Sequence, residues 1–246
     1  MSTTFTITRT AANTTNLSRK KRTRLFFNHL YQYVAITLQF IYSLLHSKKT
    51  KKMIPNNNNN NVALQYYKGK TLVLDLDETL VHSVRLGSET ITEVSPSIIH
   101  KTIEVQCDKQ SLLYEVYKRP HVDFFLKTIS QWYKIVIYTA SMAEYADPVI
   151  DWLDQDNIIS QRFFRQSCVV RNGNFLKDLT LAEKDLNKVC LIDNSPVAFD
   201  LYKENGIALP TWISNPNDES LLDLLPFLDA LRFAADVRSI LRLQHC

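Results

Sequence analysis

The chain has 246 residues, of which 45% are hydrophobic and 22% are charged, and its formal net charge is +4. This length and composition fit a globular protein with one good-sized core and some additional segments. The four cysteines, Cys107, Cys168, Cys190 and Cys246, show no paired close spacing. That pattern argues against a zinc site and against a disulfide framework, and it favours a domain that faces a reducing compartment.

The charge is distributed unevenly along the chain. Residues 1–74 contain 12 Lys and Arg and no acidic residue, whereas residues 75–246 contain 17 basic and 25 acidic residues. Residues 1–24 are also rich in Ser, Thr and Asn, so we predict a disordered basic arm there. Such an arm favours contacts with a membrane or an import machinery. No nucleic-acid partner is expected, because aromatic residues do not alternate with the basic ones.

Residues 25–46 are predicted to form a membrane-associated helix. Apolar residues such as Phe27, Leu30 and Val34 recur at helical spacing, and the polar stripe of this helix is narrow. A helix of this length extends roughly 33 Å, which is barely enough to cross a bilayer. Basic clusters flank both ends, and a helix that lies in one leaflet keeps both beside anionic lipid. The sequence favours this interfacial helix over a membrane span, although both stay open. Residues 47–67 follow as a basic, Asn-rich linker.

From residue 68 the pattern changes to alternating strands and helices. Short apolar runs at 71–74, 134–138 and 188–192 are typical of buried parallel strands. This alternation predicts an α/β domain over residues 68–243 with a doubly wound, mainly parallel sheet. The other predicted elements are a strand at 112–118 that pairs with 101–106, helices after Pro120, through 145–152 and at 196–204, and a helical segment at 221–243 interrupted at Pro226.

Polar residues follow the three buried strands. Asp75, Thr139 and Asp193 stand at their carboxyl ends, where ligands bind in an open parallel sheet. Asp75 and Asp77 lie two residues apart, so one carboxylate can attack phosphorus while the other acts as a general acid and base. Because two adjacent carboxylates repel each other and a phosphate, the site needs a cation such as Mg²⁺. Thr139 and Lys177 can hold the phosphoryl oxygens.

The order of these motifs along the chain resembles the haloacid dehalogenase phosphatases. The resemblance is closer to the small C-terminal-domain phosphatases, and within them to the nuclear-envelope branch, the Dullard phosphatases. The motifs are VLDLDETLVHS at 73–83, KRPHVDFF at 118–125, YTAS at 138–141, KDL at 177–179, LIDNSP at 191–196 and LLPFLDALRF at 224–233. The resemblance covers residues 68–243 and does not extend to the basic arm.

By this resemblance, three groups of site residues are expected. The catalytic residues are Asp75 as nucleophile, Asp77 as general acid and base, and Thr139 and Lys177 as ligands of the phosphoryl oxygens. The magnesium ligands are Asp75, the backbone carbonyl of Asp77, and Asn194, with Asp193 in support. Arg165 and Tyr145 occupy positions that contact substrate in the family, although a surface ion pair for Arg165 and a packing role for Tyr145 stay open.

The resemblance also implies a function. The segments between Ser83 and Pro120 and over 156–176 leave room for little more than hairpins, so no large cap is expected and a phosphorylated loop of another protein can reach the site. We expect a magnesium-dependent protein serine/threonine phosphatase that acts on a lipin-type phosphatidate phosphatase and thereby regulates lipid synthesis and the nuclear membrane. A small membrane protein is expected as its regulatory subunit.

Two cellular placements follow from these features. The resemblance implies the endoplasmic reticulum or nuclear envelope, with the catalytic domain facing the cytosol or nucleoplasm. The basic, Ser/Thr-rich arm also resembles a transit peptide, which would suit a non-catalytic binding subunit of the mitochondrial inner-membrane import machinery with the same fold. A non-catalytic relative has no need of both Asp75 and Asp77, so the sequence favours the phosphatase.

Overall fold

The computed structural model describes residues 69–87, 94–107 and 110–244. The predicted basic arm, membrane-associated helix and linker lie outside these ranges and stay predictions. Within the three ranges, no helix has both the length and the apolar character that a membrane crossing requires.

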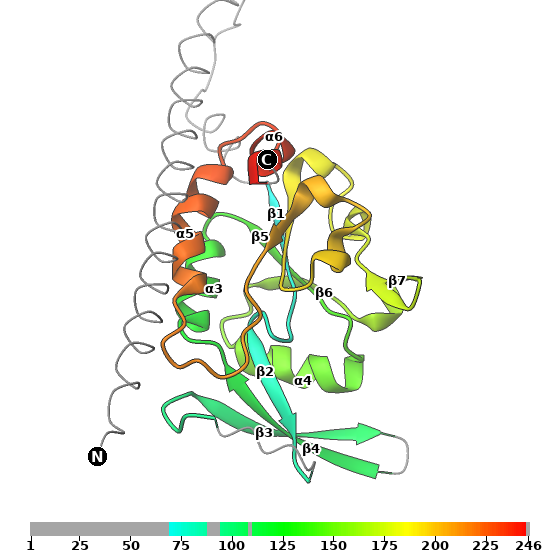
Figure 1. The fold of residues 1–246 in the computed structure, drawn as a ribbon, viewed down its shortest axis with the longest axis vertical. Coiled ribbons are helices and arrows are strands. Elements are labelled where there is room, and N and C mark those ends of the chain that lie inside the picture. The colour runs from blue at the N-terminus through cyan, green and yellow to red at the C-terminus, as the bar shows by residue number, and fades with distance from the viewer. Residues whose placement is uncertain (1–68, 88–93, 108–109, 245–246) are drawn as a thin grey trace, which may run out of the picture. The chain divides into compact units, whose positions relative to one another are not determined.

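A five-stranded parallel sheet forms the centre of the domain (Figure 1), with the strand order β10-β9-β1-β5-β6. Strand β1 pairs with both β5 and β9, so that Leu72 lies opposite Ile135 and Cys190. The three predicted apolar strands are therefore the three central strands, and the predicted mainly parallel α/β sheet is confirmed. The strands are β1 (Thr71–Leu74), β5 (Lys134–Tyr138), β6 (Ile159–Phe163), β9 (Val189–Asp193) and β10 (Gly206–Ala208).

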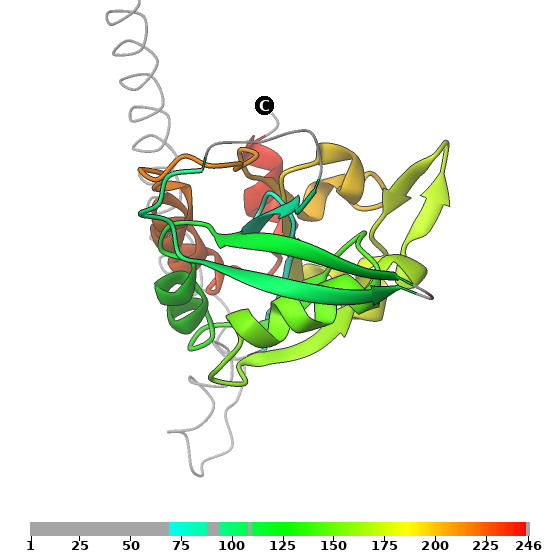
Figure 2. The ribbon, with the colours of Figure 1, turned by 90° about the horizontal axis from the view of Figure 1, so that it is seen from below.

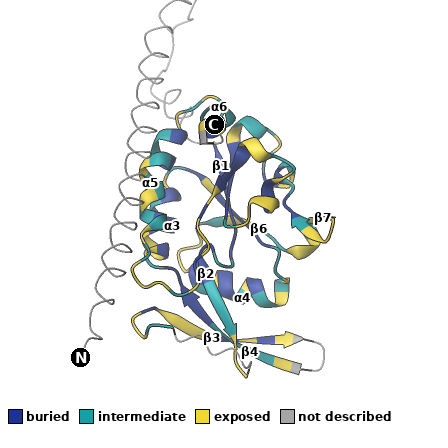
Figure 3. Cartoon of the chain, viewed as in Figure 1, coloured by how far each residue is buried: buried dark blue, intermediate teal, exposed yellow. Residues whose placement is uncertain are grey.

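Alternate residues of β1 face two different cores. Leu72 and Leu74 belong to the larger core, which α-helices cover on one face of the sheet, whereas Val73 packs on the other face under short 3-10 helical turns. Figure 3 shows how the buried residues concentrate along the sheet. A strand that is buried on both faces needs an uninterrupted apolar run, which is why the sequence identified it. The helices of the larger core are α3 (Val122–Ile129), α4 (Ala143–Leu153) and α5 (Ser220–Leu231).

Two predicted helical segments differ in the structure. Residues 196–204 form two 3-10 turns, Pro196–Phe199 and Lys203–Asn205, because the chain must turn into β10 at once. The ring of Phe199 packs so closely on Gly206 that a Cβ there would lie 2.4 Å from it. Helix α5 runs through Pro226 and ends at Leu231, so the predicted interruption at Pro226 is wrong; the helical path resumes in α6 (Arg238–Leu241).

The two insertions form small β elements. Strands β2 (Val81–Arg85), β3 (His100–Cys107) and β4 (Gln110–Lys118) make an antiparallel sheet of order β2-β4-β3. Its two long strands, β3 and β4, are the paired green ribbons that cross the centre of Figure 2, and β3 contacts α4. Strands β7 (Val169–Arg171) and β8 (Asn174–Leu176) form a separate hairpin. These elements flank the carboxyl edge of the central sheet and position the site described next.

Candidate active site

The carboxyl edge of the central sheet brings three predicted site residues together. Asp75 follows β1, Thr139 follows β5, and Asp193 ends β9. Backbone bonds continue the strand pairing at this point, since the Asp75 amide donates to the Ile192 carbonyl at 2.9 Å. All three side chains are almost fully buried. Parallel pairing thus sets residues that are far apart in the sequence at one edge.

Lys177 lies between two carboxylates at this edge. Its Nζ is 2.5 Å from Oδ1 of Asp75 and 2.6 Å from Oδ2 of Asp193. The residue follows β8, where its amide donates to the Ala198 carbonyl at 2.8 Å. Burial disfavours the charged ammonium, but the two carboxylates outweigh it and raise the pKa of Lys177. The side chain therefore stays protonated and is held in place for an anionic ligand.

Ionisation of Asp75 is unfavourable in this arrangement. Burial raises the pKa of Asp75 to about 7, against the attraction of Lys177 and with a further contribution from the Asp193 charge. When ionised, the two carboxylates outnumber the single ammonium, so the buried group holds a surplus negative charge. Oδ2 of Asp75 accepts no hydrogen bond from any residue that the structure describes. A second cation would offset the surplus and occupy this free oxygen.

The neighbouring oxygen atoms suit magnesium as that cation. Oδ1 of Asn194 accepts a hydrogen bond from Thr79 Oγ1 at 3.2 Å, which sets the amide beside the loop that carries Asp75 and Asp77. Carboxylate, amide and backbone carbonyl oxygens are the ligand types that Mg²⁺ prefers. Both oxygens of Asp193 are already engaged, by Lys177 and by the Ser195 amide, which fits its expected supporting role. Among residues 69–87, 94–107 and 110–244, no three Asp, Glu, His or Cys side chains form a metal-ligating group, and the expected set relies on an amide and a carbonyl instead.

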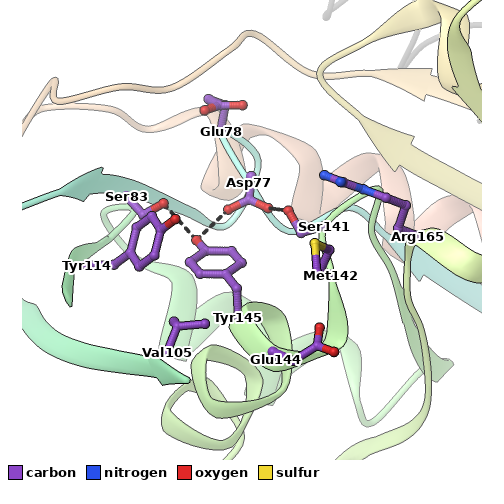
Figure 4. A pocket seen from close by; sticks show the side chains of 10 residues that line it. All are labelled: Asp77, Glu78, Ser83, Val105, Tyr114, Ser141, Met142, Glu144, Tyr145 and Arg165. Carbon is purple, nitrogen blue, oxygen red and sulfur yellow. Dashed lines mark hydrogen bonds between the residues drawn. The ribbon is translucent and has the colours of Figure 1, made fainter. Parts of the chain in front are cut away.

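Asp77 is held at both of its carboxylate oxygens (Figure 4). The Tyr145 hydroxyl donates to Oδ1 at 2.6 Å and the Ser141 hydroxyl donates to Oδ2 at 2.6 Å. The Tyr145 hydroxyl is also 2.8 Å from Oγ of Ser83. Burial raises the pKa of Asp77 although these hydrogen bonds act in the opposite direction. A raised pKa suits a group that must donate a proton near neutral pH.

Ser83 and Ser141 are functional candidates that the sequence analysis did not single out. Both lie inside family motifs, at 73–83 and 138–141, and their place in these motifs could have identified them from the sequence. Tyr145 was expected to contact substrate, and the structure places its hydroxyl on Asp77. The hydroxyl of Thr139 accepts a hydrogen bond from the Ser141 amide at 3.0 Å, which fixes the backbone of the loop after β5 relative to that side chain.

A cleft of about 390 Å³ opens beside Asp77. Arg165 stands at its side, with Nε donating to the Ala140 carbonyl at 2.6 Å and the guanidinium over the Phe175 ring at 5.3 Å. The cleft does not include Asp75 or Lys177, which are more deeply buried at the strand ends. The residues that line it are Asp77, Glu78, Ser83, Val105, Tyr114, Ser141, Met142, Glu144, Tyr145 and Arg165.

Arg119 anchors the loop between Asp75 and β2 through buried hydrogen bonds. Its side chain is fully buried and donates to the Thr79 carbonyl at 3.0 Å and to both oxygens of Asp218, at 2.8 and 3.1 Å. The Trp212 amide donates to the Glu78 carbonyl at 2.8 Å, and Glu78 has the left-handed backbone value φ 55°. A non-glycine residue adopts this conformation only where its surroundings hold it. The motif at 118–125 contains Arg119, but its partners 40 and 99 residues away could not be read from the sequence.

This sheet, with two carboxylates after its first strand and a lysine and a further aspartate at the same edge, has the arrangement expected of a haloacid dehalogenase-like phosphatase. Residues 70–238 match the NLI interacting factor-like phosphatase family, and the chain belongs to this family. The predicted enzyme class, a phosphatase, is confirmed.

Curated relatives extend over most of the chain. It is 44% identical over 219 residues to the CTD nuclear envelope phosphatase 1 homolog of Caenorhabditis elegans, covering 88% of each chain. It is 47% identical over 180 residues to the Drosophila melanogaster homolog, covering 72% of this chain and 74% of the other. Nuclear envelope morphology protein 1 of Saccharomyces cerevisiae is 43% identical over 210 residues, which cover 79% of this chain and 45% of the yeast protein.

A solved structure supports the fold. The fission yeast RNA polymerase II CTD phosphatase Fcp1, bound to beryllium fluoride, superposes with a TM-score of 0.51 at 19% identity, and the match covers 76% of this chain and 57% of that chain. At this identity the likeness bears on the fold alone. The names of the curated relatives agree with the predicted nuclear-envelope branch and with the predicted placement at the nuclear envelope or endoplasmic reticulum.

Proposed function

We propose that this chain hydrolyses phosphoserine and phosphothreonine in proteins through an aspartyl-phosphate on Asp75, with Mg²⁺ as cofactor. The observation that carries the proposal is the position of Lys177, 2.5 Å from Asp75 and 2.6 Å from Asp193 at the carboxyl edge of the sheet. A buried ammonium there can hold phosphoryl oxygens while the nearby carboxylate attacks.

The reaction divides into two displacements at phosphorus. An Asp75 oxygen bonds to phosphorus as the bond to the serine or threonine oxygen breaks, and Asp77 gives its proton to that leaving oxygen. Asp77, now ionised, takes a proton from a water molecule that attacks the same phosphorus. The bond to Asp75 then breaks, and free phosphate and the starting carboxylate are restored.

Other residues position the phosphoryl group during both displacements. Thr139 offers a hydroxyl and Arg165 a guanidinium, and both fix phosphoryl oxygens as charge redistributes. Mg²⁺, held by Asp75, Asn194 and the Asp77 carbonyl, would supply positive charge between the carboxylates and the phosphate. Asp193 orients Lys177, which sits within hydrogen-bond distance of it.

The covalent mechanism is tested by paired substitutions. Asp75→Asn should abolish turnover of an aryl phosphate and labelling by a radioactive phosphopeptide. Asp77→Asn should still be labelled where the leaving group is good and should lose the label slowly. Asp156→Asn, in an exposed turn after α4, is the matched control and should behave as wild type. Retained turnover in Asp75→Asn would exclude an aspartyl-phosphate on this residue.

We further propose that the substrate is a lipin-type phosphatidate phosphatase and that a small membrane protein acts as regulatory subunit. The resemblance of the motifs to the nuclear-envelope branch supports this substrate, and the small β insertions beside the cleft leave access for a protein loop. Phosphoserine peptides should be far better substrates than sugar phosphates. A comparable kcat/KM for a sugar phosphate would argue against a protein substrate.

We also propose that residues 25–46 bind the cytosolic leaflet without crossing it. Burial of several apolar side chains at about 1.5–3 kcal/mol each, with about 1 kcal/mol for each well-placed basic residue, is ample for binding. In sealed microsomes, external protease should remove an epitope placed at residue 1. Protection of the epitope while the catalytic domain stays accessible would show that the helix spans the membrane. Imaging of a C-terminal tag should show a reticular and perinuclear pattern; a mitochondrial pattern would favour the import alternative.

A further inference from the structure

The cleft beside Asp77 combines carboxylates with aromatic rings. Figure 4 shows Glu78 and Glu144 at opposite ends of the group of lining residues, with Tyr145 between them and Tyr114 beside Tyr145. We infer that this cleft selects phosphoserine and phosphothreonine residues that are flanked by an arginine or a lysine. The inference rests on the proposed function, because the flanking residues of a phosphopeptide must lie in this cleft when its phosphate reaches Asp75.

The two glutamates are poorly compensated within the protein. Glu144 stands exposed in the first turn of α4 and makes no ion pair or hydrogen bond with the residues described by the structure. The side chain of Glu78 is 41% exposed, and its one ion-pair contact within the described residues is to His82, whose Nδ1 lies 3.6 Å away and whose ring carries a charge only when protonated. Arg165 is the one lysine or arginine among the cleft residues. In the proposed function, the phosphate of the substrate engages it. Two carboxylates then face the rest of the peptide without a counter-charge.

The aromatic and apolar residues complete a surface for a long basic side chain. The rings of Tyr114 and Tyr145 have centroids 5.2 Å apart and are tilted by 58°. A guanidinium or ammonium group is attracted to the face of such a ring. Val105 and Met142 line the same cleft and can pack against the aliphatic stem. An acidic flanking residue is repelled by Glu78 and Glu144, so the cleft discriminates in both directions.

A simpler role for Glu144 would be to stabilise α4, since an acid in the first turn interacts favourably with the helix dipole. If Glu144 had only that role, its substitution would change the melting temperature and would not change the preference between two peptides. The ratio of kcat/KM for two peptides, measured with one enzyme, separates the roles because it cancels any general loss of activity or folding.

The experiment uses the full chain and two phosphoserine peptides that differ only in the residues within two positions of the phosphoserine, arginine in one and glutamate in the other. Wild type should prefer the arginine peptide by about tenfold at low salt, as two partly exposed ion pairs would give. The ratio should fall in about 0.5 M NaCl because exposed charges are screened. Glu144→Gln should reduce the ratio, and Glu144→Lys should bring it to unity or reverse it.

Asp156→Lys is the matched control, because it makes the same change of charge at an exposed position outside the cleft, and its ratio should equal that of wild type. Equal kcat/KM for the two peptides with wild type would overturn the inference. So would a preference that survives in Glu144→Lys. Failure of wild type to hydrolyse any phosphopeptide would instead overturn the proposed function.

Discussion

The hydroxyl of Tyr145 lies 2.6 Å from Oδ1 of Asp77 and 2.8 Å from Oγ of Ser83. Tyr145 of α4 and Ser83 of β2 therefore meet beside Asp77, which lies two residues after the proposed nucleophile, Asp75. Ser141 holds the second oxygen of Asp77, so the carboxyl group cannot turn without breaking a hydrogen bond. The network fixes both the orientation and the proton affinity of the proposed general acid.

Tyr145→Phe should therefore change the pH dependence of the reaction. The Tyr145 hydrogen bond favours the ionised form of Asp77 and lowers its pKa, so its loss should raise the pKa of Asp77 above the already raised wild-type value. Because the general acid acts in its protonated form, the alkaline limb of the kcat profile for a phosphopeptide should move to higher pH, with kcat reduced by about tenfold or more. An unchanged profile with a raised KM would instead indicate that Tyr145 contacts substrate only.

Asp75→Asn should stabilise the metal-free protein at alkaline pH. The pKa of Asp75 is about 7 in the folded protein and near 4 when unfolded, so the folded state binds the extra proton between these values. Stability from this group is therefore lost as pH rises from about 4 to about 7. In the presence of a chelator, the variant should melt a few degrees above wild type at about pH 8, and the difference should shrink at about pH 5. A lower melting temperature for the variant at both values would contradict this account.

Magnesium should raise the melting temperature of the wild-type protein, because a ligand that binds only the folded state stabilises it. Asn194→Ala removes the amide oxygen beside the Asp75 loop and should reduce this thermal shift. It should also raise the magnesium concentration for half-maximal activity by about tenfold or more. Asn217→Ala, at an exposed amide, is the control. Full activity of wild type in a chelator would exclude magnesium as the cofactor.

Arg119→Met should destabilise the fold strongly, because it leaves the largely buried Asp218 without its charged partner. We expect a loss of about 3–5 kcal/mol in the free energy of unfolding, measured by denaturant titration. Burial would raise the pKa of Asp218, but Arg119 outweighs it and lowers that pKa, so the contribution is present above about pH 4 and is lost as pH falls through the lowered value. The double variant Arg119→Met, Asp218→Leu should recover part of the loss. No recovery would show that the Arg119 hydrogen bonds to the Thr79 and Pro210 carbonyls dominate.

The sequence by itself determined the central strands and the carboxylates that follow them. The apolar runs at 71–74 and 134–138 identify strands buried on both faces. These signals are local, because burial selects apolar side chains residue by residue and a strand or helix repeats them at a fixed period. The pair Asp75 and Asp77 is also local, since both residues leave the same strand.

Only the tertiary structure decided which side chains meet. Lys177 reaches Asp75 from a loop 102 residues further on, and Arg119 reaches Asp218 across 99 residues. The hydroxyl of Tyr145 lies on Asp77 because α4 packs beside β3, and the turns at 196–205 replace a helix because β10 follows at once. Such contacts depend on strand register, the packing of helices on the sheet and the length of each connection. Those quantities belong to the whole domain, so no single segment of the sequence encodes them.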